Sequence, residues 1–156
     1  MPTLFVNGTN DFAYPLDSYQ KSYHLAKGPR TLCVTVRMPH GHQAGWKPAE
    51  IGLFVDSVLK QGKPLARVEQ SSREGASVSV EFASKVPLKQ AQLHYTLDAG
   101  PWQKRNWKSI PAVLNGNSVT AELPRQTDVV YFVTVTDDRG AVVSTEHEVI
   151  SGNNAE

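Results

Sequence analysis

The sequence lacks most of the features that would place a 156-residue chain in a specialised class at once. A single cysteine, Cys33, excludes a disulfide within the chain, so packing of apolar side chains must hold the fold together. No apolar run approaches the roughly 20 residues that a membrane-spanning helix needs. The 16 Lys and Arg residues nearly balance the 15 Asp and Glu residues and are scattered, which indicates neither nucleic acid nor a membrane as a partner.

The first 62 residues alternate strand-like and helix-like segments. Short, apolar, β-rich runs at 2–7 and 31–37 predict buried parallel strands, and apolar residues at helical spacing predict helices at 16–26 and 48–60. Such a βαβα unit needs helices on both faces of a larger sheet. Two strands cannot provide that sheet, so the unit predicts neighbouring strands that these residues do not contain.

The rest of the chain changes to an alternation of apolar and polar residues. Turn signals rich in Gly, Asn and Asp separate the alternating runs, which is typical of an antiparallel β-sandwich of the immunoglobulin or fibronectin type III kind. The predicted fold class is therefore α/β followed by all-β, with an α/β segment at 1–62, a linker at 63–66 and a β-sandwich at 67–152. The predicted strands of the sandwich are 77–83, 91–97, 118–123, 129–135 and 142–150.

Two loops that follow the predicted strands of the first segment carry candidate functional residues. Asp11 follows the first strand, where a carboxylate could orient an imidazole as a catalytic acid or could simply form a turn. His40 and His42 follow the second strand on a glycine-containing loop, and an imidazole there could transfer protons because imidazole titrates near neutral pH. Neither a metal site nor a cofactor is predicted, since no third metal ligand lies at a suitable spacing.

The motifs around these residues resemble a known family. They are G-T-N-D-F-A-Y-P at 8–15, G-P-R-T-L-C-V-T-V-R at 28–37 and M-P-H-G-H-Q-A-G-W at 38–46. Together they resemble the C-terminal part of an α/β-hydrolase of the acetyl xylan esterase-like and prolyl-oligopeptidase-like serine hydrolase group, in which the acid and then the histidine follow the last core strands. The resemblance implies Asp11 as the acid and His42 as the base of a Ser-Asp-His triad, with His40 as the alternative base.

The nucleophile of that family is missing from the sequence. No G-x-S-x-G motif occurs, so we expect a C-terminal fragment of a serine esterase that acts on an ester or acyl-carbohydrate and is inactive without the N-terminal hydrolase core. A serine peptidase of the prolyl oligopeptidase group is an alternative. No secretory signal begins the sequence, which leaves the compartment of this chain unknown, while the resemblance implies a periplasmic or secreted bacterial parent.

The tryptophans indicate a function of a different class. Trp102 and Trp107 lie in an irregular, basic stretch of the sandwich segment, and Trp46 ends the histidine motif. Exposed rings at these positions could contact a substrate or a sugar, although large aromatic side chains in strand-rich segments are more often buried. The alternative function is therefore an accessory β-sandwich module that binds carbohydrate or packs on a catalytic domain.

Overall fold

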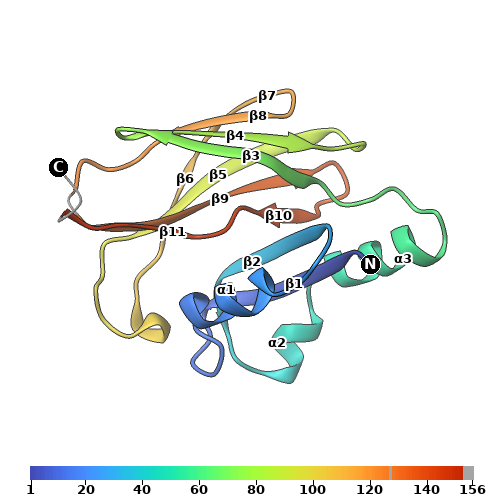
Figure 1. Ribbon diagram of the computed structural model, residues 1–156, viewed down its shortest axis with the longest axis horizontal. Coiled ribbons are helices and arrows are strands. Elements are labelled where there is room, and N and C mark those ends of the chain that lie inside the picture. The colour runs from blue at the N-terminus through green and yellow to red at the C-terminus, as the bar shows by residue number, and fades with distance from the viewer. Residues whose placement is uncertain (127, 153–156) are drawn as a thin grey trace.

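The computed structural model describes residues 1–126 and 128–152, which form two β-sheets with helices gathered beside the larger one (Figure 1). The larger sheet contains β1 (Thr3–Asn10), β2 (Arg30–Pro39), β5 (Leu88–Thr96), β6 (Lys108–Pro111), β9 (Val129–Asp137), β10 (Val142–Ser144) and β11 (Glu148–Ile150). The smaller sheet contains β3 (Arg67–Glu74), β4 (Ser77–Ala83), β7 (Val113–Asn115) and β8 (Ser118–Glu122). The helices are α1 (Leu16–His24), α2 (His42–Trp46), α3 (Glu50–Leu59) and the short 3-10 helix η1 (Trp102–Lys104).

The strand order shows how the two halves of the sequence are joined. The larger sheet runs β1-β2-β10-β9-β5-β6, with β11 also paired to β9, and the smaller sheet runs β3-β4-β8-β7. All these pairings are antiparallel except that of β1 with β2. Within the described residues, no helix is long and apolar enough to cross a membrane.

The main core lies between the two sheets. In β4 and β8, alternating residues point inward, because successive side chains of a strand face opposite sides of the sheet. Val78, Val80, Leu93, Val119 and Val133 are each at most 1% exposed and belong to one cluster that includes residues of both sheets. Burial of such a side chain contributes about 1.5–3 kcal/mol, so these contacts are the main stabilisation of the sandwich.

The outer face of the larger sheet is also covered in part. A second cluster packs Val130 and Phe132 of β9 against Trp107 and against Leu16 and Val34 of the N-terminal segment. Apolar residues on both faces of β9 explain its unbroken run V-V-Y-F-V, which a strand with one solvated face would not show. The N-terminal segment therefore packs beneath the sandwich, as Figure 1 shows.

The structure corrects the predicted fold class. β2 pairs in parallel with β1 and antiparallel with β10, where Leu32 lies opposite Ser144. The backbone N–H of Val34 also donates to Ser144 Oγ at 3.2 Å. The neighbour that the sequence argument found missing for the second strand is thus β10 of the same chain. The prediction of a partial α/β-hydrolase core followed by a β-sandwich is wrong, because the fold is predominantly β, with 46% strand and 19% helix.

The outer edge of β1 is largely closed by its own surroundings. Alternate residues of a parallel strand direct their backbone groups to opposite sides, and Val6 and Gly8 direct theirs away from β2. The Tyr19 hydroxyl donates to Val6 O at 3.1 Å. Gly8 N donates to Asn7 Oδ1 at 2.8 Å, and Asp11 N donates to Gly8 O at 3.4 Å. These bonds reduce the free edge that would otherwise invite another strand.

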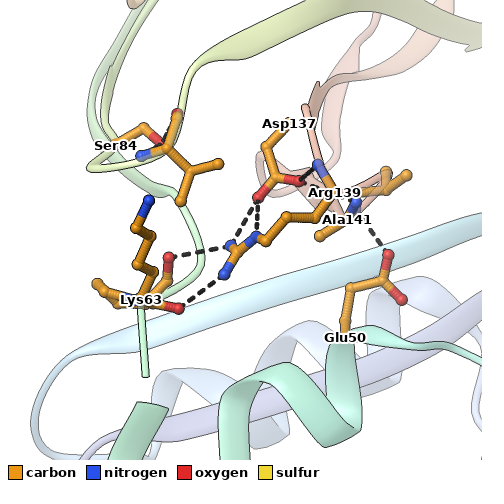
Figure 2. Close-up of polar contacts among 9 residues, drawn as sticks. Glu50, Lys63, Ser84, Asp137, Arg139 and Ala141 are labelled. Carbon is orange, nitrogen blue, oxygen red and sulfur yellow. Dashed lines mark hydrogen bonds and ion pairs between the residues drawn. The ribbon is translucent and has the colours of Figure 1, made fainter. Parts of the chain in front are cut away.

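Polar contacts hold the segment between α3 and β3 against the sandwich (Figure 2). The Arg139 guanidinium lies 2.6 Å from Asp137 Oδ2 and donates to the carbonyls of Lys63 and Pro64 at 2.8 and 3.2 Å. Asp137 is buried and its Oδ1 accepts the backbone N–H groups of Arg139 and Ala141. The predicted linker at 63–66 is therefore bound to the turn between β9 and β10.

Helix α3 makes a second contact with that part of the sheet. The buried Glu50 points from α3 toward the turn, and its Oε1 accepts the backbone N–H of Val142 at 2.6 Å (Figure 2). A carboxylate that accepts a backbone N–H makes a strong, charge-assisted bond, which fixes the end of β10 to the helix. The division of the chain at residues 63–66 into two folding units stays a prediction.

Candidate functional site

An irregularity in β2 shapes the region after the first two strands. Between Gly8 and Asn10 of β1 the register moves from Thr35 to Pro39 of β2, so β2 has two extra residues there. Arg37, inside this bulge, has a φ of 60°. Positive φ is uncommon for a residue other than glycine, and bulges with such residues redirect a strand. The bulge therefore changes the direction in which β2 leaves the sheet.

The same region requires a glycine in β1. A Cβ atom on Gly8 would lie 1.9 Å from Met38 O, so only a residue without a side chain allows the two strands to approach this closely. The close approach and the bulge bring the loop after β2 to the loop after β1. As a result, His40 Nδ1 lies 3.1 Å from Asp11 Oδ2.

Asp11 forms a turn and also contacts an imidazole. Its Oδ1 accepts the backbone N–H groups of Ala13 and Tyr14 at 2.8 and 2.9 Å, which forms a turn, while its Oδ2 faces His40. The residue is 7% exposed. When Nδ1–H donates to this carboxylate, Nε2 of the same ring is left as an acceptor for an outside partner. The structure thus pairs Asp11 with the imidazole that the sequence argument ranked second.

His42 occupies a different position from the one expected of the base. It is the exposed first residue of α2, and none of the hydrogen bonds among the described residues joins its ring to Asp11. The two extra residues in β2 explain the difference, because they shift the point at which the chain passes the carboxylate.

Exposed aromatic side chains surround the pair of Asp11 and His40. The ring of His40 lies 5.2 Å from that of Phe12, edge to face, and 5.6 Å from that of Tyr14. Phe12 is 66% exposed, Tyr14 57% and Trp46 74%. We refer to Phe12, Tyr14, His40 and Trp46 as the aromatic strip.

Two adjoining hollows connect three members of the aromatic strip, Tyr14, His40 and Trp46. One is lined by Tyr14 and His40 together with Asp11, and the other by His40 and Trp46 together with His42. Both hollows share His40 and the two glycines Gly41 and Gly45. The strip therefore combines aromatic surface with ordered polar groups along one continuous part of the molecule.

The described residues do not place a nucleophile beside this imidazole. Asp11 is the one side-chain hydrogen-bond partner that His40 has there, so no hydroxyl or thiol is held for activation. The Cys33 thiol is buried within β2, and burial raises its pKa to about 12, which opposes formation of the thiolate. No group of three or more potential metal ligands occurs in the part of the chain that the structure describes. Catalytic roles for Asp11, His40 and His42 stay predictions.

The two tryptophans of the sandwich segment are not on the open surface. Trp107 is 1% exposed, packs against Phe132 and has an indole N–H without a partner among the described residues, so its predicted contact with a substrate does not fit the structure. Trp102 is partly buried, with the Arg105 guanidinium 3.8 Å from its ring centre and the ring of His147 at 5.2 Å. Both rings have structural partners. Trp46 is the predicted substrate-contacting tryptophan that the structure exposes.

Sequence reasoning did not select Phe12 and Tyr14. Both follow Asp11 in the loop F-A-Y-P, outside any regular apolar pattern. An aromatic residue in an irregular loop does not belong to the periodic apolar pattern of a buried strand or helix face, so its side chain can be expected to be exposed. This was the signal in the sequence that could have found Phe12 and Tyr14. The spatial grouping with His40 needed the register of β1 and β2 to be known.

Comparison with known proteins gives little similarity. No family model matches the sequence, and no curated protein has a significantly similar sequence. Among solved structures, the chain is similar to a crystal structure of a carbohydrate-binding module family 56 β-1,3-glucan binding domain, with 16% sequence identity and a TM-score of 0.35. The match covers 55% of this chain and 96% of that chain. A likeness of this size carries no argument about function, which has to come from the residues themselves.

The resemblance to acetyl xylan esterase-like and prolyl-oligopeptidase-like serine hydrolases is wrong as an identification. An α/β-hydrolase core is a mostly parallel sheet with helices on both faces. Here β1 and β2 form the only parallel pair among the described strands, and β2 continues antiparallel into a predominantly β fold of two sheets. The hydrolase, esterase and peptidase functions that rested on the resemblance lose their support.

Proposed function

We propose that this protein is a carbohydrate-binding β-sandwich module whose ligand binds on the aromatic strip. The observation that carries the proposal is the exposure of three large aromatic side chains around one ordered polar pair. Phe12, Tyr14 and Trp46 all remain more than half exposed, although burial of such rings would stabilise the fold. Apolar surface that is kept exposed and grouped together is typical of binding sites.

The chemistry of the aromatic strip suits a sugar ring. A pyranose has a C–H-rich face that packs on an aromatic ring and a rim of hydroxyl groups that need hydrogen-bond partners. Tyr14 and Trp46 offer the flat surfaces, and Nε2 of His40 offers an acceptor that Asp11 keeps oriented through Nδ1. His42 supplies a further polar group at the edge of the hollow beside Trp46.

The electrostatics of the aromatic strip favour an uncharged ligand. The Asp11 carboxylate is already bound by two backbone N–H groups and an imidazole, so its charge is directed into the protein and not toward solvent. Such a site binds through stacking and neutral hydrogen bonds, and its affinity should depend little on salt. We therefore expect neutral oligosaccharides as the first ligands to test.

The direct test is affinity electrophoresis of the protein through gels that contain soluble polysaccharides, followed by calorimetric titration with oligosaccharides of a retained type. Tyr14→Ala and Trp46→Ala should each weaken binding about ten-fold or more, because aromatic residues at the centre of a site contribute most of its affinity. A panel of β-glucans, xylans and mannans covers the common backbones. No retardation by any of these polysaccharides would refute the proposal.

Leu25→Ala is the matched control. Leu25 is 81% exposed, lies at the end of α1 and does not line either hollow of the aromatic strip. Its removal takes away apolar surface of similar exposure, so it should leave binding unchanged. An equal loss of affinity in the control and in Trp46→Ala would show that retention reflects general stickiness, which also contradicts a site on the strip.

A further inference from the structure

A second concave region lies on the other side of α2. It is a groove of about 720 Å³ between the outer face of the larger sheet and the overhanging segment formed by β2, α2 and the start of α3. This volume lies within the roughly 300–1,000 Å³ of typical ligand sites. Ala44 and Lys47 line the groove, whereas Gly45 and Trp46 of the same short helix region line the aromatic strip. The groove shares Met38 and Pro39 with the hollow beside Tyr14, but no member of the aromatic strip lines it, so it is a separate site.

The floor of the groove is polar, and hydrogen bonds fix three of its side chains. Gln92 and His94 of β5, Ser109 of β6 and Thr134 and Thr136 of β9 line it. His94 is buried, with Nδ1 2.7 Å from Ser109 Oγ and Nε2 2.9 Å from Thr134 Oγ1. Burial lowers the pKa of His94 to about 4, so the ring is neutral at pH 7.

A neutral imidazole donates through one nitrogen and accepts through the other. One of the two hydroxyls therefore donates to the ring, and the other accepts from it and keeps its own O–H free. The hydroxyls of Ser109 and Thr134 thus present both a donor and acceptors at fixed positions. Sugar hydroxyls, which donate and accept at once, match such a surface.

The wall of the groove is basic. Arg37 and Lys47 line it, and the one acidic residue among its described lining, Glu50, already accepts the backbone N–H of Val142. Arg37 is held in place, because its Nη2 donates to Trp107 O at 2.9 Å and its backbone N–H donates to Thr9 Oγ1 at 2.8 Å. Its φ of 60° is a strained conformation, and such strain persists where the surrounding structure imposes it, often at binding sites.

We propose that this groove binds an acidic saccharide, with the carboxylate of a uronic acid unit near Arg37 and Lys47 and the sugar hydroxyls on Gln92, Ser109 and Thr134. An oriented guanidinium is well suited to a carboxylate, and the ammonium group adds a second positive charge. The groove shares the broad ligand class of the aromatic strip but none of its residues. It extends the proposed function from neutral to acidic sugars.

The test compares two forms of one ligand. A galacturonic acid trisaccharide and its fully methyl-esterified form have the same skeleton and differ in charge, so their affinity ratio measures recognition of the carboxylate. The full-length protein should bind the acid form about ten-fold more tightly at low salt, as expected for charge-assisted hydrogen bonds. Raising the salt concentration should reduce this preference.

Two variants locate the site. Lys47→Gln changes an exposed side chain and should reduce the preference for the acid about three-fold, and Arg37→Gln should abolish most of it. Lys85→Gln removes an exposed positive charge from a loop of the sandwich that does not line the groove and should leave the preference unchanged. Circular dichroism checks that each variant is folded, and because Lys47 is exposed its variant remains informative even where Arg37→Gln does not fold.

The outcomes separate this inference from the proposed function. Equal affinity for the acid and the ester, or an unchanged ratio in Lys47→Gln, would overturn the groove as an acidic-sugar site. Loss of neutral-sugar binding in Tyr14→Ala is a separate result that bears on the aromatic strip. The inference would also be overturned if Lys85→Gln reduced the preference for the acid as strongly as Lys47→Gln does. That result would indicate attraction by the overall charge of the protein.

Discussion

The aromatic residues of the sandwich core and those just after β1 and β2 are used in opposite ways. In the sandwich, Phe82, Trp107 and Phe132 are buried almost completely and are among the largest side chains of the core. In the loops after β1 and β2, Phe12 and Trp46 are mostly exposed. Residues of the same chemical type thus stabilise one region and cover the surface of the other.

This difference shows which aromatic residues are free to bind a ligand. A buried ring already contributes to folding, and moving it would cost several kcal/mol. An exposed ring contributes little to folding and is available at no such cost. Stability and binding should therefore depend on different aromatic residues in the two regions, and the following substitutions test this separation.

The largest effect is expected for Phe132→Ala. Phe132 is 0% exposed and packs against the rings of both His94 and Trp107, so its truncation should lower the free energy of unfolding by about 3–5 kcal/mol. Phe12→Ala, the matched change on the aromatic strip, should alter it by no more than about 0.5 kcal/mol. Urea denaturation followed by tryptophan fluorescence measures both. Similar losses for the two variants would mean that the regions do not differ in this way.

Acid should destabilise the sandwich through its buried histidines. Burial lowers the pKa of His94 and of His147 to about 4, from about 6.5 in the unfolded chain. The unfolded chain therefore binds more protons between these values, so stability is retained above pH 6.5 and falls as the pH drops toward 4. Each ring contributes a loss of roughly 3 kcal/mol across this window.

His94→Gln tests that assignment. The variant will be less stable at pH 7, because its contacts with Ser109 and Thr134 are altered, but its further loss between pH 6.5 and 4 should be smaller than that of the unchanged protein by roughly 3 kcal/mol. Urea denaturation at a series of pH values gives the change of the free energy of unfolding with pH for the variant and for the unchanged protein. An equal change in both proteins would show that His94 does not control the acid sensitivity.

A smaller effect on stability is expected at the contact between the N-terminal segment and the sandwich. Arg139→Met removes the partner of the buried Asp137 carboxylate and the bonds to Lys63 and Pro64, and should cost about 2 kcal/mol because the side chain is partly exposed. Thermal unfolding measures the loss. Limited proteolysis should also cleave the segment around residue 63 faster.

Lys60→Met is the control for this substitution. It removes an ion pair with Asp56 in which both side chains are more than half exposed, so its cost should stay below about 1 kcal/mol. If the two variants lose equal stability, the network around Arg139 is no stronger than a surface ion pair.

The smallest effect on stability is expected for Trp46→Ala. The ring is mostly exposed and forms part of a short helix, so the free energy of unfolding should change by no more than about 0.5 kcal/mol. The same variant is expected to lose sugar binding. A large loss of stability here would remove the distinction between structural and available aromatic rings.

Much of the secondary structure could be read from local patterns. The runs that predict β4, β8 and β9 alternate or are continuously apolar, and the structure has strands at those positions. By contrast, the sequence analysis did not predict β3, because all eight of its residues are exposed and R-V-E-Q-S-S-R-E carries no apolar period. Local pattern therefore identifies strands with a buried face and overlooks those without one.

The way in which the elements join could not be read in the same manner. β2 looks like a parallel core strand, and the antiparallel partner on its other side, β10, comes more than a hundred residues later. Pairing over such a separation leaves no local signal, so the error in fold class arose there. The bulge in β2 is likewise a tertiary feature, and it decides that Asp11 meets His40 and not His42.

The contact at Gly8 limits how this protein can be re-engineered. Any side chain at that position would collide with the backbone at Met38, and relief of the collision would draw the two loops apart. A designer who wishes to give the protein a new ligand can randomise Phe12, Tyr14 and Trp46 at little risk to folding. Position 8 must be left constant in every such library, although Gly8 lines neither hollow of the aromatic strip.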